Sequence, residues 1–247
     1  MSGLIVVTRP EPDASDYADE LKAQGYSVLV EPMLKIVSCD FEVPDMSDYH
    51  GVLLTSANAI RAFMDRVENF DLDFNIPVYC VGKHTAAAAQ YAGFLNVISV
   101  DGIGADLLVY VLGLEDVQGK RFLHLCGDHV AFPLVERLKD KGVHSDALAV
   151  YRSKAVQEFS SEFIDALRNG DIEAVTFFSK RTAQVFVGLI AESDSESEIC
   201  ERLCGIKALS ISQSVVECVR VLRWGVSYVS ETPDRAGIMA LLKAYVS

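Results

Sequence analysis

The sequence lacks an excess of positive charge: its 247 residues carry a formal net charge of −13. This charge argues against a nucleic-acid partner, because a phosphate backbone requires a basic surface. It also gives no general attraction to an anionic ligand, so such a ligand must be held by local donors. Half of the residues are hydrophobic, which is enough for the core of one large or two small domains.

Three further features are missing. The six cysteines form no Cys-x-x-Cys pair, so we expect free thiols in a reducing cytoplasm, and Cys200 and Cys204 have no histidine near them that would complete a metal site. The first residues contain no basic stretch followed by an apolar segment, so no signal peptide is expected. The apolar run at residues 107–114 is too short to cross a bilayer, and no membrane contact is expected.

The sequence is organised around a motif that occurs twice, at residues 51–60 and 174–183. Each copy has an apolar strand, then a serine, then the start of a helix, with Ser56 and Ser179 as the expected caps. A helix start carries unpaired N–H groups and a partial positive charge, which suit carboxylate or phosphate oxygens. A serine cap often has no ligand, so it is the repetition that favours a binding role. Two such sites facing each other would suit a ligand with many anionic groups.

Strands and helices alternate along the whole chain, which predicts an α/β fold with parallel sheets covered on both faces. About ten strands are expected, and they divide into two flavodoxin-like sheets of five. The predicted strands lie at residues 4–8, 26–30, 51–54, 77–81, 96–100, 121–127, 145–150, 173–178, 206–211 and 226–229. Ligands of such sheets bind beyond the carboxyl ends of the strands. Polar signals occur there at Arg9, Ser56, residues 82–85, Cys126-Gly127, Ser179 and residues 212–214.

Five short segments together resemble the uroporphyrinogen-III synthase family, over essentially the whole length of the chain. They are Val7-Thr8-Arg9-Pro10, residues 53–59 (Leu-Leu-Thr-Ser-Ala-Asn-Ala), residues 81–86 (Val-Gly-Lys-His-Thr-Ala), Val150-Tyr151-Arg152 and Phe178-Ser179. Each segment alone has little specificity, whereas their order and spacing together are fairly specific.

The resemblance implies a monomer of two α/β domains joined by a two-stranded linker. The first domain would be discontinuous, residues 1–36 plus 154–247, and the second would cover residues 40–149. The linker strands would lie at residues 33–37 and 150–153. From the residues alone, a simpler division into two consecutive halves is equally possible, so this interleaved arrangement depends on the family.

The reaction that the resemblance implies uses no cofactor. Its substrate is hydroxymethylbilane, a linear tetrapyrrole with eight carboxylates that loses its terminal hydroxyl to give an azafulvene-like cation. Attack through the substituted carbon of the last ring gives a spiro intermediate, and the macrocycle closes with that ring inverted. Because the substrate also cyclises unaided without inversion, the enzyme mainly orients the chain and assists departure of hydroxide by general acid.

By the same resemblance, Tyr151 is the expected general acid, since a phenol with a pKa of about 10 is protonated at neutral pH; the alternative is a linker tyrosine that only packs. Thr85 matches a family threonine that points into the cleft, or it is a helix cap, and Lys180 is equally compatible with a solvated face. Ser214 and Lys180 depart from the residues common in the family, which weakens both assignments. The expected substrate-binding residues are Arg9, Ser56, Ala57, Asn58, Gly82, Lys83, Thr85, Ser179, Lys180 and Ser214.

Two other classes of function fit parts of the sequence. A two-domain α/β protein that binds a small molecule without chemistry would have the same alternation of elements, although the missing export signal disfavours a solute receptor. A flavodoxin-like regulatory pair would require clustered aspartates at a strand end, and none is seen.

Overall fold

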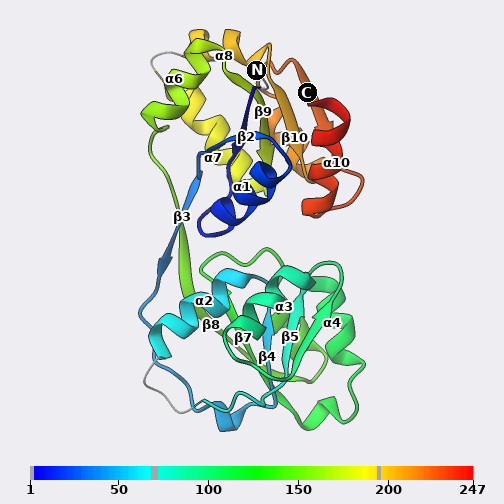
Figure 1. Ribbon diagram of the computed structural model, residues 1–247. Helices are drawn as coiled ribbons and strands as arrows, with labels where there is room; N and C mark the ends of the chain where they lie inside the picture. The colour runs from blue at the N-terminus through cyan, green and yellow to red at the C-terminus, as the bar shows by residue number, and fades with distance from the viewer. Residues whose placement is uncertain (1–2, 68–71, 194–195, 247) are drawn as a thin grey trace. The chain divides into compact units, whose positions relative to one another are not determined.

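The computed structural model describes residues 3–67, 72–193 and 196–246, and the chain divides into two compact units. Unit 1 comprises Met1–Lys35 and Lys154–Ser247, and unit 2 comprises Ile36–Ser153. Unit 1 is therefore discontinuous in sequence. Both boundaries between the units lie inside strands, one in β3 (Leu34–Ser38) and the other in β8 (His144–Ala155) (Figure 1).

Unit 1 is built on a parallel sheet with the strand order β11-β10-β9-β1-β2. Its strands are β1 (Leu4–Val7), β2 (Ser27–Val30), β9 (Ile172–Phe177), β10 (Lys207–Ser210) and β11 (Val226–Val229). Its helices are α1 (Asp13–Ala23), α6 (Ser161–Asn169), α7 (Lys180–Ala191), α8 (Glu196–Leu203), α9 (Gln213–Val219) and α10 (Arg235–Tyr245).

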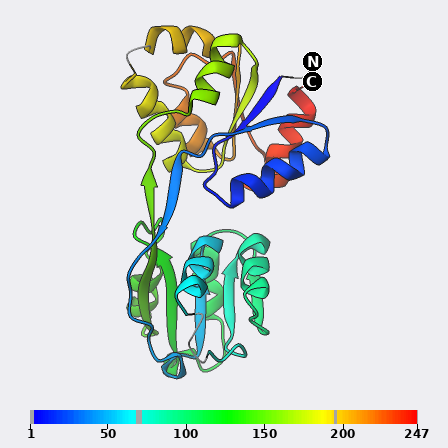
Figure 2. The ribbon, with the colours of Figure 1, turned by 60° about the vertical axis from the view of Figure 1, so that its left-hand side comes forward.

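Helices cover both faces of this sheet because its strands carry apolar side chains on both sides. On one face, α1 and α10 bury residues such as Tyr17 and Leu242 against β1, β9 and β10. On the other face, α6, α7, α8 and α9 form a cluster that includes Phe163 and Phe186. Figure 2 shows the blue α1 and the red α10 together on one side of the sheet of unit 1.

Unit 2 contains the second sheet, with the order β3-β8-β7-β4-β5-β6. Besides β3 and β8, its strands are β4 (Gly51–Leu54), β5 (Val78–Val81), β6 (Val97–Val100) and β7 (Arg121–Gly127). Its helices are α2 (Ala57–Val67), α3 (Gly82–Tyr91), α4 (Gly104–Leu112) and α5 (Leu134–Asp140), with short 3-10 turns at Met46–Asp48 and Val117–Gly119. The helices α2 and α3 pack on one face of the sheet, and α4 and α5 pack on the other.

The predicted α/β fold with parallel sheets is confirmed, but the prediction of two five-stranded sheets is wrong for unit 2, whose sheet has six strands among the described residues. The additional strand is β3, which the family resemblance places in the linker. It lies beside β8, where Cys39 N–H donates a hydrogen bond of 2.9 Å to Val150 O. An extended segment next to an open sheet edge satisfies its backbone groups in this way.

The segment predicted as a strand at residues 145–150 followed by a linker at 150–153 is one continuous strand, β8, of 12 residues.

Among the described residues, the structure contains no helix with the length and apolar character that a membrane span requires.

Candidate functional site

Both predicted serine caps are present. Ser56 precedes α2, and its Oγ accepts a hydrogen bond of 3.2 Å from Asn58 N–H. Ser179 precedes α7, and its Oγ accepts one of 3.1 Å from Thr182 N–H. In each first turn the serine thus satisfies one amide, whereas the first amides, those of Ala57 and Lys180, have no acceptor within their own helices.

The start of α3 is different because no side chain caps it; its N-cap residue is Val81. Gly82 has a φ of +74°, a backbone conformation that favours glycine. Lys83 is exposed, whereas Thr85 is only 5% exposed and packs inside unit 2. The first turn of α3 therefore offers uncapped amides together with one exposed cation.

A pocket of about 300 Å³ lies in unit 2, where β4, β5 and β7 end. Two of the expected catalytic and substrate-binding residues, Ser56 and Tyr151, line it. The other lining residues come from these strand ends and from two loops: Thr55, Val81, Gly102, Ile103, Gly104, Cys126, Gly127, His129, Val130, Ala131 and Phe132. The structure thus brings the proposed acid and one serine cap to the same pocket, which is where ligands of parallel sheets bind.

The Tyr151 ring lies against the backbone of Gly127. The two residues are paired in register between β8 and β7, and Tyr151 is only 9% exposed. A Cβ added to Gly127 would lie 2.7 Å from Tyr151 Cζ and 3.0 Å from its hydroxyl oxygen. No side chain fits between the two residues. The glycine at position 127 therefore allows the phenol of Tyr151 to lie at the wall of the pocket.

We expect Gly127→Ala to displace the Tyr151 ring and to lower both activity and stability. Overpacking of this kind costs about 1–3 kcal/mol, and a misplaced catalytic group lowers kcat by roughly tenfold or more. Urea unfolding measures the stability, and turnover of the substrate that the family resemblance implies measures the activity. Gly119→Ala is the matched control, because a Cβ there meets no atom within 4 Å. Wild-type turnover in the Gly127→Ala variant would show that the position of the phenol does not matter.

His124 lies behind the pocket and is 1% exposed in β7. Burial lowers the pKa of His124 to about 4, so the ring is neutral at pH 7. Its Nε2 lies 3.3 Å from Oγ1 of Thr55, which lines the pocket. Burial also raises the pKa of the Cys126 thiol to about 11, so this lining residue is a thiol and not a thiolate. The interior of unit 2 behind the pocket is therefore uncharged at these two residues.

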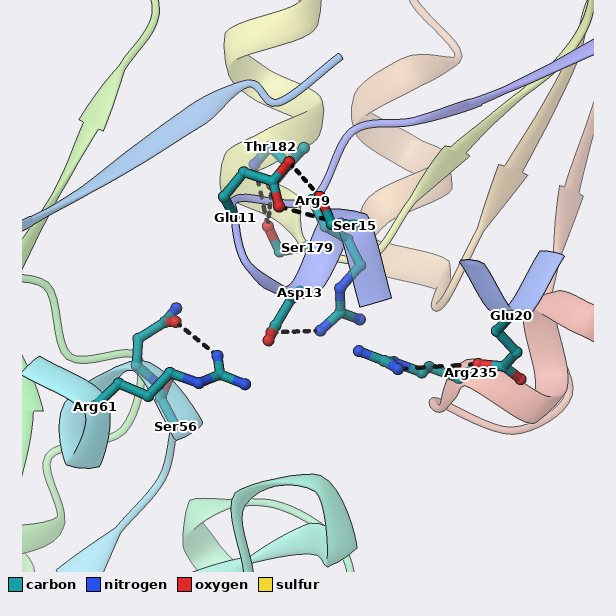
Figure 3. A network of polar contacts seen from close by, with 11 residues as sticks. Arg9, Glu11, Asp13, Ser15, Glu20, Ser56, Arg61, Ser179, Thr182 and Arg235 are labelled. Atoms are coloured by element: carbon teal, nitrogen blue, oxygen red, sulfur yellow. Dashed lines mark hydrogen bonds and ion pairs between the residues drawn. The ribbon is translucent and has the colours of Figure 1, made fainter. Parts of the chain in front are cut away.

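In unit 1, three predicted residues follow three neighbouring strands. Arg9 comes after β1, Ser179 after β9 and Ser214 after β10. Arg9 is paired with Asp13, with 2.8 Å between Nη2 and Oδ2 (Figure 3). Its guanidinium carbon lies 4.6 Å from the centre of the Phe178 ring. Ser214 is exposed, and its Oγ lies 3.1 Å from that of Ser212, which makes no capping bond. Because of its bond to Asp13, Arg9 already has one of its hydrogen-bond donors in use.

Two features of the site were not found from the sequence. Gly127 was noted as a strand end, but its contact with Tyr151 requires the pairing of β7 with β8. Arg235 was not singled out from the sequence, and its half-buried position beside Tyr17 depends on how α10 packs beside α1. Among the described residues, no group of three or more histidine, cysteine, aspartate or glutamate side chains has the geometry to hold a metal ion.

Comparison with known proteins identifies a family. The family model described as Uroporphyrinogen-III synthase HemD matches residues 15–240. The chain is 25% identical over 238 residues to the "Uroporphyrinogen-III synthase" of Synechococcus elongatus, covering 88% of this chain and 86% of that protein. It is 22% identical over 208 residues to the "Porphyrin biosynthesis protein HemD" of Ruminiclostridium josui, covering 78% of this chain but only 40% of that protein. The crystal structure of uroporphyrinogen-III synthetase from Helicobacter pylori has a similar fold, with a TM-score of 0.64 and 18% identity over 99% of both chains.

Proposed function

The chain belongs to the uroporphyrinogen-III synthase family, and from this membership we propose that it cyclises hydroxymethylbilane to uroporphyrinogen III. The proposed reaction removes the terminal hydroxyl as water and closes the macrocycle with the last pyrrole ring inverted. The observation that supports this proposal most specifically is the pocket of unit 2, which is lined by both Tyr151 and the start of α2.

Tyr151 is proposed as the general acid. Its hydroxyl donates a proton to the leaving hydroxyl, which departs as water and leaves an azafulvene-like cation. The contact with Gly127 supports this role because it fixes the phenol on the pocket wall. The neighbouring His124 ring is neutral and buried, so it adds no positive charge that would oppose formation of the cation. Orientation of the bound chain then selects attack through the substituted carbon of the last ring.

The carboxylates of the substrate are proposed to bind backbone amides at the helix starts. Bulk electrostatics does not attract them, because the chain carries a net charge of −13. The amides of Ala57, Gly82 and Lys180 begin helices of 10 to 12 residues, where the partial positive charge of the helix adds to the hydrogen bond. The exposed side chains of Lys83 and Lys180 stand beside these amides and add charge-assisted bonds. Asn58, Thr85 and Ser214 remain proposed contacts of the substrate.

The two units are proposed to be the two domains of the enzyme. Numbered within unit 1, the strand order is 2-1-3-4-5, which supports a flavodoxin-like domain. Without β3, the order in unit 2 is 3-2-1-4-5, which matches the first five strands of the dinucleotide-binding order. The protein is further proposed to act as a cytoplasmic monomer; the buried free thiols of Cys80 and Cys126 suit a reducing compartment.

The function is tested by supplying freshly prepared hydroxymethylbilane and separating the isomers formed. Because the substrate closes by itself without inversion, a blank without protein gives the reference rate and the reference isomer. We expect the protein to accelerate closure and to give the inverted isomer III as the main product. Formation of only the uninverted isomer at the blank rate would refute the proposed function.

The capture of carboxylates by backbone amides predicts that the Ser56 side chain matters little for binding. Ser56→Ala removes a helix cap, which costs about 1 kcal/mol of stability, but leaves the Ala57 amide in place. We expect the affinity for uroporphyrinogen III, measured anaerobically by calorimetry, to change by less than about threefold, since this corresponds to less than 1 kcal/mol. Ser179→Ala is the matched variant in unit 1. A folded Ser56→Ala protein that no longer binds the product would show that the hydroxyl, and not the backbone, makes the contact.

A further inference from the structure

Arg235, the first residue of α10, is a half-buried cation whose buried nitrogens make no hydrogen bond within the part of the chain that the structure describes. Its guanidinium carbon lies 5.7 Å from the centre of the Tyr17 ring. Its Nε and Nη2 atoms are buried and have no hydrogen-bond partner among the described residues. Its Nη1 lies 3.8 Å from Glu20 Oε2, which is too long for a hydrogen bond. Leaving a charged donor unsatisfied in this way is costly unless a ligand completes its bonding.

A second guanidinium lies beside it. Arg9 belongs to the segment between β1 and α1, and Figure 3 shows its guanidinium and that of Arg235 approaching each other from different elements. The side chain of Arg9 is 16% exposed, and its Nε is also buried without a partner among the described residues. The two cations lie on rings that touch, because the Tyr17 and Phe178 centroids are 5.1 Å apart in an edge-on arrangement.

The charged groups near Arg9 and Arg235 leave part of the hydrogen-bonding capacity of the two guanidinium groups unused among the described residues. Burial lowers the pKa of Arg235, and the like charge of Arg9 lowers it further, although the carboxylates of Asp13, Glu20 and Asp16 act in the opposite direction. Of these carboxylates, Asp13 accepts a hydrogen bond from the pair, through Arg9. Nε of both guanidinium groups and Nη2 of Arg235 stay without hydrogen-bond partners among the described residues, although three carboxylates act on Arg235, and a planar carboxylate matches the fork of donors that guanidinium presents.

We propose that Arg9 and Arg235 together bind one carboxylate side chain of the substrate on unit 1. This inference rests on the proposed function and adds to it a residue, Arg235, that binds substrate through its side chain rather than through the backbone. Arg9 comes after the carboxyl end of β1, and the segment that follows the end of β11 leads to Arg235. The site therefore belongs to the edge of the sheet where α7 begins. Its role is to hold substrate and product alike, so it contributes to affinity and not to the chemical step.

The test compares Arg235→Gln with Arg202→Gln, which removes the same charge from an exposed position on α8, on the other face of the sheet. We expect Arg235→Gln to raise KM for hydroxymethylbilane about tenfold, as loss of one charged hydrogen-bonding group does, with kcat changed by less than about twofold. Arg235→Lys retains the charge without the fork and is expected to give an intermediate KM. Arg202→Gln is expected to match the wild type.

Three outcomes would overturn the proposal: an unchanged KM in Arg235→Gln, an equal rise in KM in Arg202→Gln, or a fall in kcat alone. A thermal unfolding midpoint near that of the wild type separates the binding role from a structural one. Binding of uroporphyrin III, a stable octacarboxylate, is measured in parallel by fluorescence titration and does not depend on turnover. If the wild type fails to accelerate ring closure, the proposed function is refuted, and the carboxylate site then stands only if uroporphyrin III binds about tenfold more weakly to Arg235→Gln.

Discussion

Replacement of Tyr151 by phenylalanine is expected to lower kcat for hydroxymethylbilane by about 100-fold or more, the range for loss of a positioned general acid. KM is expected to change little, because the ring that lies against Gly127 is retained. For the same reason, the free energy of unfolding should stay within about 1 kcal/mol of the wild type, as expected when packing volume is conserved. Stopped assays with isomer separation give the rate, and urea unfolding gives the stability.

The matched control is Tyr79→Phe. Tyr79 lies in β5 of the same sheet and is also 9% exposed, but it does not line the pocket. Loss of its hydroxyl should leave kcat unchanged. If Tyr151→Phe retains wild-type kcat, or if both variants lose activity equally, Tyr151 is not the general acid and the leaving hydroxyl is protonated by another group.

The second large effect concerns stability and pH. The pKa of His124 is about 4 in the folded protein, lowered by burial, against about 6.5 in an unfolded chain. Between these values the unfolded chain binds a proton that the folded protein does not, so stability decreases as the pH falls from 6.5 to 4. Over this interval His124 alone should remove about 3 kcal/mol of unfolding free energy. Above pH 6.5 it contributes no pH dependence.

His124→Gln should remove this part of the acid sensitivity while leaving the contribution of the carboxylates. The measurement is the free energy of unfolding in urea at several pH values from 4 to 7, and the slope is compared rather than the absolute stability. His144→Gln, at an exposed position on β8, is the control and should keep the slope of the wild type. Identical slopes in the wild type and His124→Gln would mean that His124 is not buried as a neutral ring.

The local parts of the fold were accessible from the sequence because they depend on neighbouring residues. Ser56 and Ser179 each cap a helix directly after an apolar strand, and the period of the apolar residues and the choice of cap predict this without tertiary information. Parallel pairing follows from the alternation of strands and helices. The substrate followed from the family resemblance and not from composition, periodicity or helix caps.

The features that the sequence did not predict depend on packing between distant segments. The segment of β3 is extended whether or not it pairs, so its addition to the sheet beside β8 follows from an open sheet edge and not from its own residues. Gly127 resembles any glycine at the end of a strand, and only the register between β7 and β8 shows that it lies against Tyr151. Arg235 follows an ordinary cap, Asp234, and the packing of α10 beside α1 leaves its Nε and Nη2 without hydrogen-bond partners among the described residues.

The central claim is that backbone amides where the strands end hold a polycarboxylate. Titration of isotopically labelled protein with uroporphyrin III, followed through backbone amide chemical shifts, tests it most directly. We expect the largest shifts at Ala57, Gly82, Lys83 and Lys180, together with residues of the pocket that Tyr151 lines. Shifts confined to the opposite edge of the unit 2 sheet, around the hollow lined by Asp45, Tyr49 and Asp73, would contradict it.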